Sequence, residues 1–434
     1  MVKTLATGLQ AASVDFATLH KQYHPVLAVV KEMIGVVPNC DPILEIWPPA
    51  FRSYNVLVPN LFNLPNVLFT SRSFKSSIGL AMYSASRAAA CAYCMSHTCS
   101  FALRRGVSAD AITGKRTPKE QAVVDLATGL ATIPASLNME QVRMAGTFFT
   151  DTEVEWLALA ASMMGFLNKF MNAMGIQLEQ DAIDDTASVL SVTGWTPGQH
   201  AQGDYRITKT STPPQDNLFT YLRVVKQAPG AIALEKKWTR DVPYSYALVS
   251  DYLQNRVGYS FPILKPITQR RVVRAIATVI ADNLNKELTV VGLKTKMLAG
   301  YIFSRIVAND ALTNEMKNIS YQLAPDLATE TYDRLDAIAR WEIPQDSLSC
   351  KEAIASVQIQ LNVSEKEAVA LMLALAASPS PALLSESVVE TILSQMEPAA
   401  IVETVAWLSV LQLLHRLNSY YSVIFGLPKA SLRN

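Results

Sequence analysis

Charged residues are scarce in this 434-residue chain. Only 17% of its residues are Asp, Glu, Lys or Arg, and 38 basic residues nearly balance 37 acidic ones, for a net charge of +1. Proteins that follow the phosphates of DNA or RNA gather an excess of basic side chains in a stripe or patch. The sequence has no such stripe, so we expect no nucleic-acid partner.

Long apolar runs are also lacking. No uninterrupted run reaches the roughly 18 residues that a membrane-crossing helix needs, so we expect no membrane span. The first ten residues lack a continuous apolar core with a cleavage site, which argues against a secretory signal. They contain few acidic residues, a composition that organelle-targeting segments share. We expect a cytoplasmic protein and keep organelle targeting as the alternative.

Cysteine is rare and unevenly placed. The odd number of five cysteines does not suit the disulfide framework of a secreted domain and fits a reducing compartment with one redox pair. Three of them fall within nine residues, and the five are Cys40, Cys91, Cys94, Cys99 and Cys350.

Apolar residues make up half of the chain, Ala and Leu are frequent, and only 17 residues are Gly. This composition is typical of a helix-rich globular protein, so we expect an all-α fold. The length suggests two or three domains, each able to bury its own core. The apolar surplus predicts buried subunit interfaces, and we expect a homo-oligomer.

The most informative stretch runs from residue 88 to residue 106. No Gly or Pro interrupts residues 80 to 105, which predicts one helix that ends at Gly106. On that helix Cys91 and Cys94 are i,i+3 neighbours, close enough for a disulfide or for attacking and resolving roles. His97 is three residues after Cys94 and can approach its sulfur. Arg87 shares the face of both thiols and would favour a thiolate.

Metal binding and haem attachment fit this stretch less well. Zinc needs four ligands, and a second Cys/His pair at finger spacing is missing. Covalent haem attachment needs His directly after the second Cys, where Met95 stands. We therefore expect neither metal nor cofactor. Three buried structural thiols with a hydrogen-bonded His97 in a helical core remain an alternative.

These residues resemble the signature motif of a known protein family. The segment Cys91-Ala-Tyr-Cys94-Met-Ser-His97-Thr, after Ser-Ala-Ser-Arg-Ala-Ala-Ala, resembles the signature of the carboxymuconolactone decarboxylase and alkyl hydroperoxidase D-like family. Flanking similarity extends roughly over residues 55 to 179. The resemblance implies an all-helical, oligomeric domain, often with thiol peroxidase or disulfide reductase chemistry. Other members decarboxylate a lactone without a cysteine pair.

Two positions depart from the family's pattern. The more familiar motif places His one residue later, where Thr98 stands in this chain. Redox members place a Glu about three turns before the first Cys, and this chain has Gly79 there. The proton relay that the family implies is therefore incomplete in the sequence, and a Glu from the helix predicted over residues 151 to 174 is a candidate replacement.

The amino-terminal region has a helical pattern over residues 13 to 34, which Pro25 must kink or split. On it, His20 and His24 are predicted to lie on a solvated face. Residues 37 to 65 contain six prolines, which preclude long helices. We expect an ordered, extended arm that packs on the cysteine helix or on a neighbouring subunit and forms one wall of a substrate pocket.

The second half matches the first at constant shifts. A shift of 247 places Lys119 on Lys366 and Pro134 on Pro381, and upstream a shift of 218 places Arg87 on Arg305. The same alignment puts non-thiol residues at the motif, with Asn309, Leu312 and Glu315 opposite Cys91, Cys94 and His97. We predict an amino-terminal arm (1–65), an alkyl hydroperoxidase D-like domain (66–180), a linker (181–216) and a degenerate second copy (217–434).

The leading functional prediction is a thiol-dependent oxidoreductase with Cys94 as the His97-assisted thiol, Cys91 as its partner and Arg87 as the supporting cation. Its substrate would be a small hydroperoxide or a protein disulfide, and a dithiol would restore the pair. One alternative is a cysteine-independent decarboxylase or lyase that uses His97 as acid or base. The other is a non-catalytic subunit that builds an oligomer.

Overall fold

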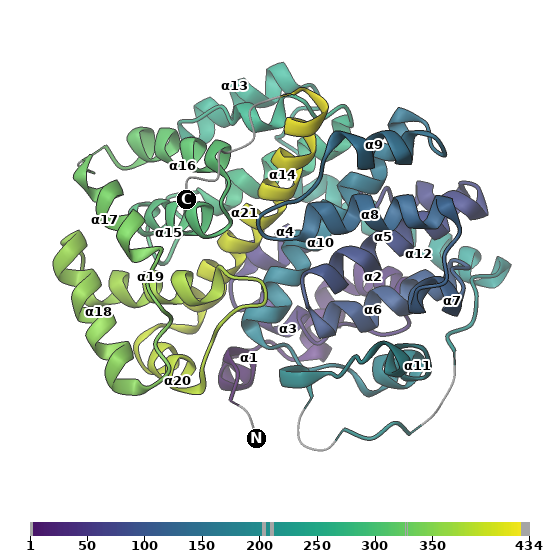
Figure 1. The fold of residues 1–434 in the computed structure, drawn as a ribbon, viewed down its shortest axis with the longest axis horizontal. Helices are drawn as coiled ribbons and strands as arrows, with labels where there is room; N and C mark the ends of the chain where they lie inside the picture. The colour runs from purple at the N-terminus through teal and green to yellow at the C-terminus, as the bar shows by residue number, and fades with distance from the viewer. Residues whose placement is uncertain (1–2, 202–204, 209–211, 326, 328, 427–434) are drawn as a thin grey trace.

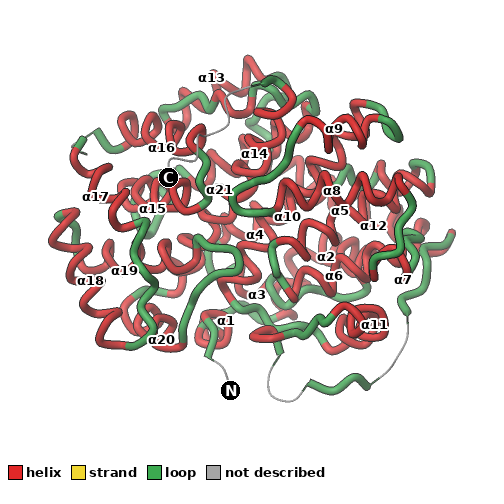
Figure 2. Tube along the Cα trace, viewed as in Figure 1, coloured by secondary structure: helices red, strands yellow, loops and turns green. Residues whose placement is uncertain are grey.

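The computed structural model describes residues 3–201, 205–208, 212–325, 327 and 329–426. Every regular element in these ranges is a helix, and none is a strand (Figure 2). The predicted all-α fold is confirmed.

The α-helices are α1 (Leu5–Gly8), α2 (Phe16–Ile34), α3 (Asp41–Leu44), α4 (Pro48–Leu61), α5 (Arg72–Ala88), α6 (Ala92–Arg104), α7 (Ala109–Thr113), α8 (Pro118–Ala131), α9 (Met139–Gly146), α10 (Asp151–Met174), α11 (Gln180–Leu190), α12 (Leu218–Trp238), α13 (Tyr246–Val257), α14 (Arg270–Asn283), α15 (Leu293–Ile306), α16 (Asp310–Leu323), α17 (Glu330–Ile338), α18 (Ser347–Leu361), α19 (Glu365–Ala377), α20 (Glu386–Gln395) and α21 (Pro398–Ile424). Short 3₁₀ turns occupy Gln10–Ala12, Asn66–Phe69, Ser191–Thr193, Gly198–His200 and Pro262–Leu264.

Helices α10 and α21 form the centre of the molecule and pack along each other more extensively than any other helix pair (Figure 1). Their backbones approach closely at Gly165, where an added Cβ would lie 2.8 Å from the carbonyl oxygen of Gln412. By length and composition α21 could cross a membrane, but 89% of its most apolar window is buried inside this chain. Its apolar surface is therefore used in the core.

Helix boundaries in the two halves differ by the two shifts seen in the sequence. Helices α5 and α15 end at residues 88 and 306, and α6 and α16 begin at residues 92 and 310, a difference of 218 in both cases. Helices α8 and α19 begin at 118 and 365, and α10 and α21 at 151 and 398, a difference of 247. These boundaries are consistent with an internal repeat, which stays a prediction.

The expected single helix over residues 80 to 105 is wrong. Helix α5 ends at Ala88, Ala90 adopts a left-handed φ of 50°, and α6 begins at Ala92 with Cys91 as its N-cap. The turn lets α5 fold back and pack against α6. At Gly79 an added Cβ would lie 2.8 Å from the Cα of Ala102, so this close packing requires a glycine.

The amino-terminal arm is more helical than expected. Helix α4 has 14 residues, because two of its prolines occupy the first two helical positions, where no backbone N–H is needed, and Pro59 lies within its last turn. The prediction that prolines preclude a long helix here is therefore wrong. The kink predicted before Pro25 is confirmed by the non-helical backbone of Tyr23.

The segment predicted as a linker begins as a helix. Helix α11 covers its first ten residues and packs against α6 and α7, so residues 181–190 belong to the first half's core. Parts of the predicted linker at 202–204 and 209–211, and residues 326, 328 and 427–434 of the predicted second copy, lie outside the described residues.

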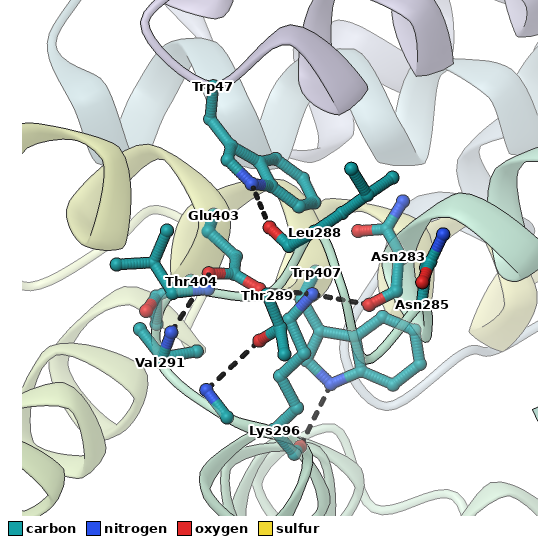
Figure 3. A network of polar contacts seen from close by, with 12 residues as sticks. Trp47, Asn283, Asn285, Leu288, Thr289, Val291, Lys296, Glu403, Thr404 and Trp407 are labelled. Atoms are coloured by element: carbon teal, nitrogen blue, oxygen red, sulfur yellow. Dashed lines mark hydrogen bonds and ion pairs between the residues drawn. The ribbon is translucent and has the colours of Figure 1, made fainter.

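A buried ion pair stabilises the second half and connects it to the arm (Figure 3). Lys296 Nζ lies 2.7 Å from Glu403 Oε1, while Glu403 Oε2 accepts the backbone N–H of Val291 at 3.0 Å. The Lys296 ammonium also lies 4.7 Å from the ring centre of Trp47, whose indole N–H donates to the Leu288 carbonyl. Both charges therefore have partners, as buried charges require.

Candidate thiol site in an apolar cavity

The two motif cysteines meet at the beginning of α6. Their Sγ atoms lie 2.8 Å apart, and the Cys91 sulfur accepts the Cys94 backbone N–H at 3.4 Å. A disulfide has an S–S distance of about 2.05 Å, so only a small approach separates the free thiols from a bond. Cys91 is fully buried and Cys94 is 3% exposed.

The Cys94 side of this pair faces a cavity of about 360 Å³. Helices α2, α4, α6, α10 and α12 all contribute to its walls, which are mostly apolar, with Val30, Met33, Val58, Phe62, Met171 and Val224 among the lining residues. Residues of the amino-terminal arm form one wall, as expected from its aromatic residues. Cys94 and His97 share this space with other polar groups, among them Cys40, Tyr54 and Tyr93.

His97 is paired with a carboxylate that the sequence did not indicate. Its Nε2 lies 2.8 Å from Oε2 of Glu179, whose other oxygen accepts the Tyr93 hydroxyl at 3.0 Å and the Asn39 backbone N–H at 2.5 Å. Burial raises the pKa of Glu179, but the charge and hydrogen bond of His97 and the Asn39 N–H outweigh it, so the pKa is lowered overall. Glu179 is therefore a carboxylate at neutral pH.

The other ring nitrogen of His97 has no hydrogen-bond partner in the part of the chain that the structure describes. It is buried beside an apolar cavity, where an unpaired polar atom is costly. Glu179 at Nε2 thus orients the ring and leaves Nδ1 unpaired among the described residues.

The carboxylate beside His97 comes neither from position 79 nor from α10. Glu179 is the N-cap residue of α11, after the end of α10. The close approach of Gly79 to Ala102 leaves no space there for any side chain. No local spacing could have identified Glu179, because it lies 82 residues after His97 (179 minus 97).

Arg87 does not have the predicted position. Because the chain turns between α5 and α6, the i−4 relation to Cys91 is lost, and Arg87 is exposed, within electrostatic range of Tyr83 and Arg116. A different cation, Arg416 of α21, lies within electrostatic range of both thiols; it is fully buried and donates to the Ala161 carbonyl at 2.8 Å.

The electrostatics of Cys94 are dominated by burial. Burial raises the pKa of its thiol well above the ordinary value, and the adjacent Cys91 and Cys40 add to the rise, whereas Arg416 opposes it. Burial also lowers the pKa of Arg416 to about 9, and the two sulfur atoms counteract this shift. Cys94 is thus a neutral thiol at neutral pH, and a proton acceptor is needed to form its thiolate.

The histidines predicted on a solvated face, His20 and His24, are exposed, and their Nδ1 atoms lie 3.1 Å apart. Among the described residues, no group of three or more His, Cys, Asp or Glu side chains is placed to bind a metal ion.

The matched position in the second half is built differently. Asn309 caps α16 through its Oδ1, which accepts the Leu312 N–H at 2.9 Å, and its Nδ2 lies 2.9 Å from Nδ1 of His415. Asn418 donates to the same Oδ1 at 3.1 Å. This network contains no thiol, and both ends of the Asn309 amide have partners, so Asn309 serves as a structural cap.

The fold and site together define an all-α protein with a vicinal thiol pair, a His–Glu pair and an apolar cavity. No family model and no curated protein matches the chain. Among solved structures, the apo form of the debrominase Bmp8 is similar at 20% identity and a TM-score of 0.35, over 42% of this chain and 95% of that one. A similarity at this level carries no argument about function.

Proposed function

We propose that this protein is a thiol-dependent oxidoreductase that reduces a small hydroperoxide through Cys94 and Cys91. The observation that carries the proposal is the 2.8 Å separation of two free thiols, of which Cys94 lines a cavity that His97 also lines. Both sulfur atoms are buried, which favours a small molecule over a protein disulfide as the substrate. The resemblance of the motif to alkyl hydroperoxidase D-like proteins supports the same chemistry.

In the first step, His97 accepts the Cys94 proton, and Glu179 stabilises the resulting imidazolium. The thiolate attacks the distal peroxide oxygen, the O–O bond breaks, and Cys94 becomes a sulfenic acid. The leaving alkoxide takes the proton from His97 and departs as an alcohol. Arg416 stabilises the transient thiolate from the α21 side of the site.

In the second step, Cys91 attacks the sulfenic sulfur, which forms the Cys91–Cys94 disulfide and releases water. An external dithiol then reduces the disulfide through a mixed disulfide and is itself oxidised. The hydroperoxide gains two electrons in total, and the dithiol supplies them.

The second half is proposed to be a degenerate copy of the first that stabilises the site. It has Asn309 and Leu312 where the first half has its thiols, so it cannot perform this chemistry. It contributes α21, and with it Arg416, to the first half. A single chain would then resemble a fused dimer with one active site.

The proposal is tested by counting thiols before and after a stoichiometric dose of hydroperoxide and locating disulfides by mass spectrometry. We expect loss of two thiols, mapped to Cys91–Cys94 and reversed by dithiol. Cys94→Ser should abolish turnover, and Cys91→Ser should stop at the sulfenic acid. Cys99→Ser is the matched control, because Cys99 is a buried thiol of the same helix. Unchanged turnover in both motif variants would refute the proposal.

A cysteine-independent lyase is the second candidate, favoured by the unpartnered Nδ1 of His97 and the neutral state of Cys94. In that mechanism His97 acts as acid or base on a carbonyl or lactone, and the thiols only line the cavity. Variants distinguish the two candidate functions. If the protein is a lyase, His97→Gln eliminates its activity, while Cys91→Ser and Cys94→Ser leave it intact.

A further inference from the structure

Helix α12 has an unusual surface for a helix of a globular chain. Of its 21 residues only two are buried, Thr220 and Val224. It lies along α2, and Gly230 lets it approach Pro25, where an added Cβ would be 2.8 Å from the Pro25 Cβ. The outer face of α12 is thus free of contacts with the described remainder of the chain.

That outer face carries an apolar stripe. Leu218, Leu222, Val225 and Ile232 are 40 to 68% exposed, and their spacing of 4, 3 and 7 residues puts them on one side of an α-helix. Phe219, 68% exposed, lies beside this stripe. Contiguous exposed apolar patches of this kind mark interaction surfaces.

Basic residues flank the apolar stripe. Lys226, Lys236 and Lys237 are exposed, and none has an ion-pair partner among the described residues. The only acidic residue on α12, Glu235, faces inward and accepts the Asn60 side-chain N–H at 2.9 Å. The free charge of this face is therefore wholly positive, although the chain's net charge is only +1.

The same face borders the mouth of the cavity. Two residues of α12, Ile232 and Lys236, both line the cavity and are exposed at the surface. The same holds for Tyr244 on the following loop. The apolar interior of the cavity thus continues outward into the apolar stripe.

We propose that the outer face of α12 binds the surface of an anionic lipid bilayer. Amphipathic helices that combine a stripe of Leu, Val and Phe with flanking lysines lie in the plane of the lipid interface. Anionic headgroups would pair with the free lysines. A second copy of this chain is disfavoured, since a two-fold contact through the stripe brings the same positive flanks together. The proposal does not depend on the thiol chemistry.

The test is co-sedimentation of the full-length chain with vesicles of phosphatidylcholine alone or with about a quarter phosphatidylserine. We expect binding to the anionic vesicles, weakened by salt, and little binding to the neutral ones. Lys226→Gln should lower the affinity about fivefold, the effect of one lysine at an anionic surface. Leu222→Asp should lower it about tenfold or more.

Ile359→Asp is the matched control, because Ile359 is an exposed apolar side chain on α18, far along the chain, and we expect it to bind like the wild type. Circular dichroism verifies that each variant is folded. The proposal is overturned by equal binding to neutral and anionic vesicles, by no binding, or by equal effects of Leu222→Asp and Ile359→Asp. A dimer that Leu222→Asp splits into monomers would also overturn it, and would assign the face to a second copy.

Discussion

Acid should destabilise this protein through His200, which anchors the segment that carries the site carboxylate. Its Nδ1 donates to the Ile176 carbonyl at 2.7 Å, and its own carbonyl accepts the Leu178 N–H at 2.8 Å. Burial lowers the pKa of His200 from 6.5 to about 4, outweighing the hydrogen bond to Ile176, which raises it. Leu178 directly precedes Glu179, so protonation of His200 acts on the backbone beside the site.

The size of the effect follows from the two pKa values. Below about pH 6.5 the unfolded chain binds a proton at His200 that the folded chain does not bind until about pH 4, so the free energy of unfolding falls in this window. About pH 5 lies roughly 1.5 units below the unfolded-state pKa, so the free energy of unfolding has fallen there by about 2 kcal/mol. His415, whose pKa burial lowers to about 3, contributes a similar loss.

Buried carboxyls act in the opposite direction. Burial raises the pKa of Asp282 to about 6 and of Glu315 to about 7, so each favours the folded state as the pH falls. The total pH dependence of the wild type is therefore a composite. A difference between the wild type and His200→Asn isolates the one residue, because the amide of Asn can replace the Nδ1 donor but does not titrate.

The assay is urea unfolding at about pH 7.5 and about pH 5 for both proteins. His200→Asn should lose about 2 kcal/mol less than the wild type between the two pH values, whatever its stability at neutral pH. An equal fall in the free energy of unfolding in both proteins would refute the reasoning. It would mean that His200 is protonated, or accessible to water, in the folded state.

Two further predictions concern buried charges. Arg416→Met should shift the pH profile of thiol alkylation upward, because it removes the cation that opposes the rise in the Cys94 pKa. Lys169→Met, at the matched position in the first half, should leave the profile unchanged, and equal profiles for Arg416→Met and wild type would contradict the assignment. Glu403→Gln should lower the free energy of unfolding by about 3 kcal/mol or more in urea titrations, because Lys296 would stay buried without its carboxylate; a loss under about 1 kcal/mol would show that the pair is not needed.

Local features of the structure could be predicted from the sequence. The all-α class follows from composition, and Pro25 marks the kink in α2. Thr150 caps α10 and Gly175 ends it in a left-handed conformation, as the residue types indicate. Such predictions succeed because a cap, a proline kink or a C-terminal glycine depends on a few neighbouring residues.

The remaining site residues depend on contacts between distant segments. Glu179 reaches His97 because α11 packs against α6, and Arg416 comes within electrostatic range of the thiols because α21 packs against α10 at Gly165. The neighbouring residues also do not predict the turn at Ala90, since Ala has a high helix propensity. Tertiary packing overrides that propensity and places Cys91 at the helix start.

The two matched N-caps differ in capping strength. Asn309 is among the best capping residues and holds α16 through an oxygen at 2.9 Å from the Leu312 N–H. Cys91 holds α6 with a sulfur, a weak acceptor, at 3.4 Å. A sequence under selection for stability alone would prefer Asn at both positions, and functional sites are where such local rules are violated. Under the proposed function, Cys91 exchanges capping strength for a sulfur that lies 2.8 Å from that of Cys94.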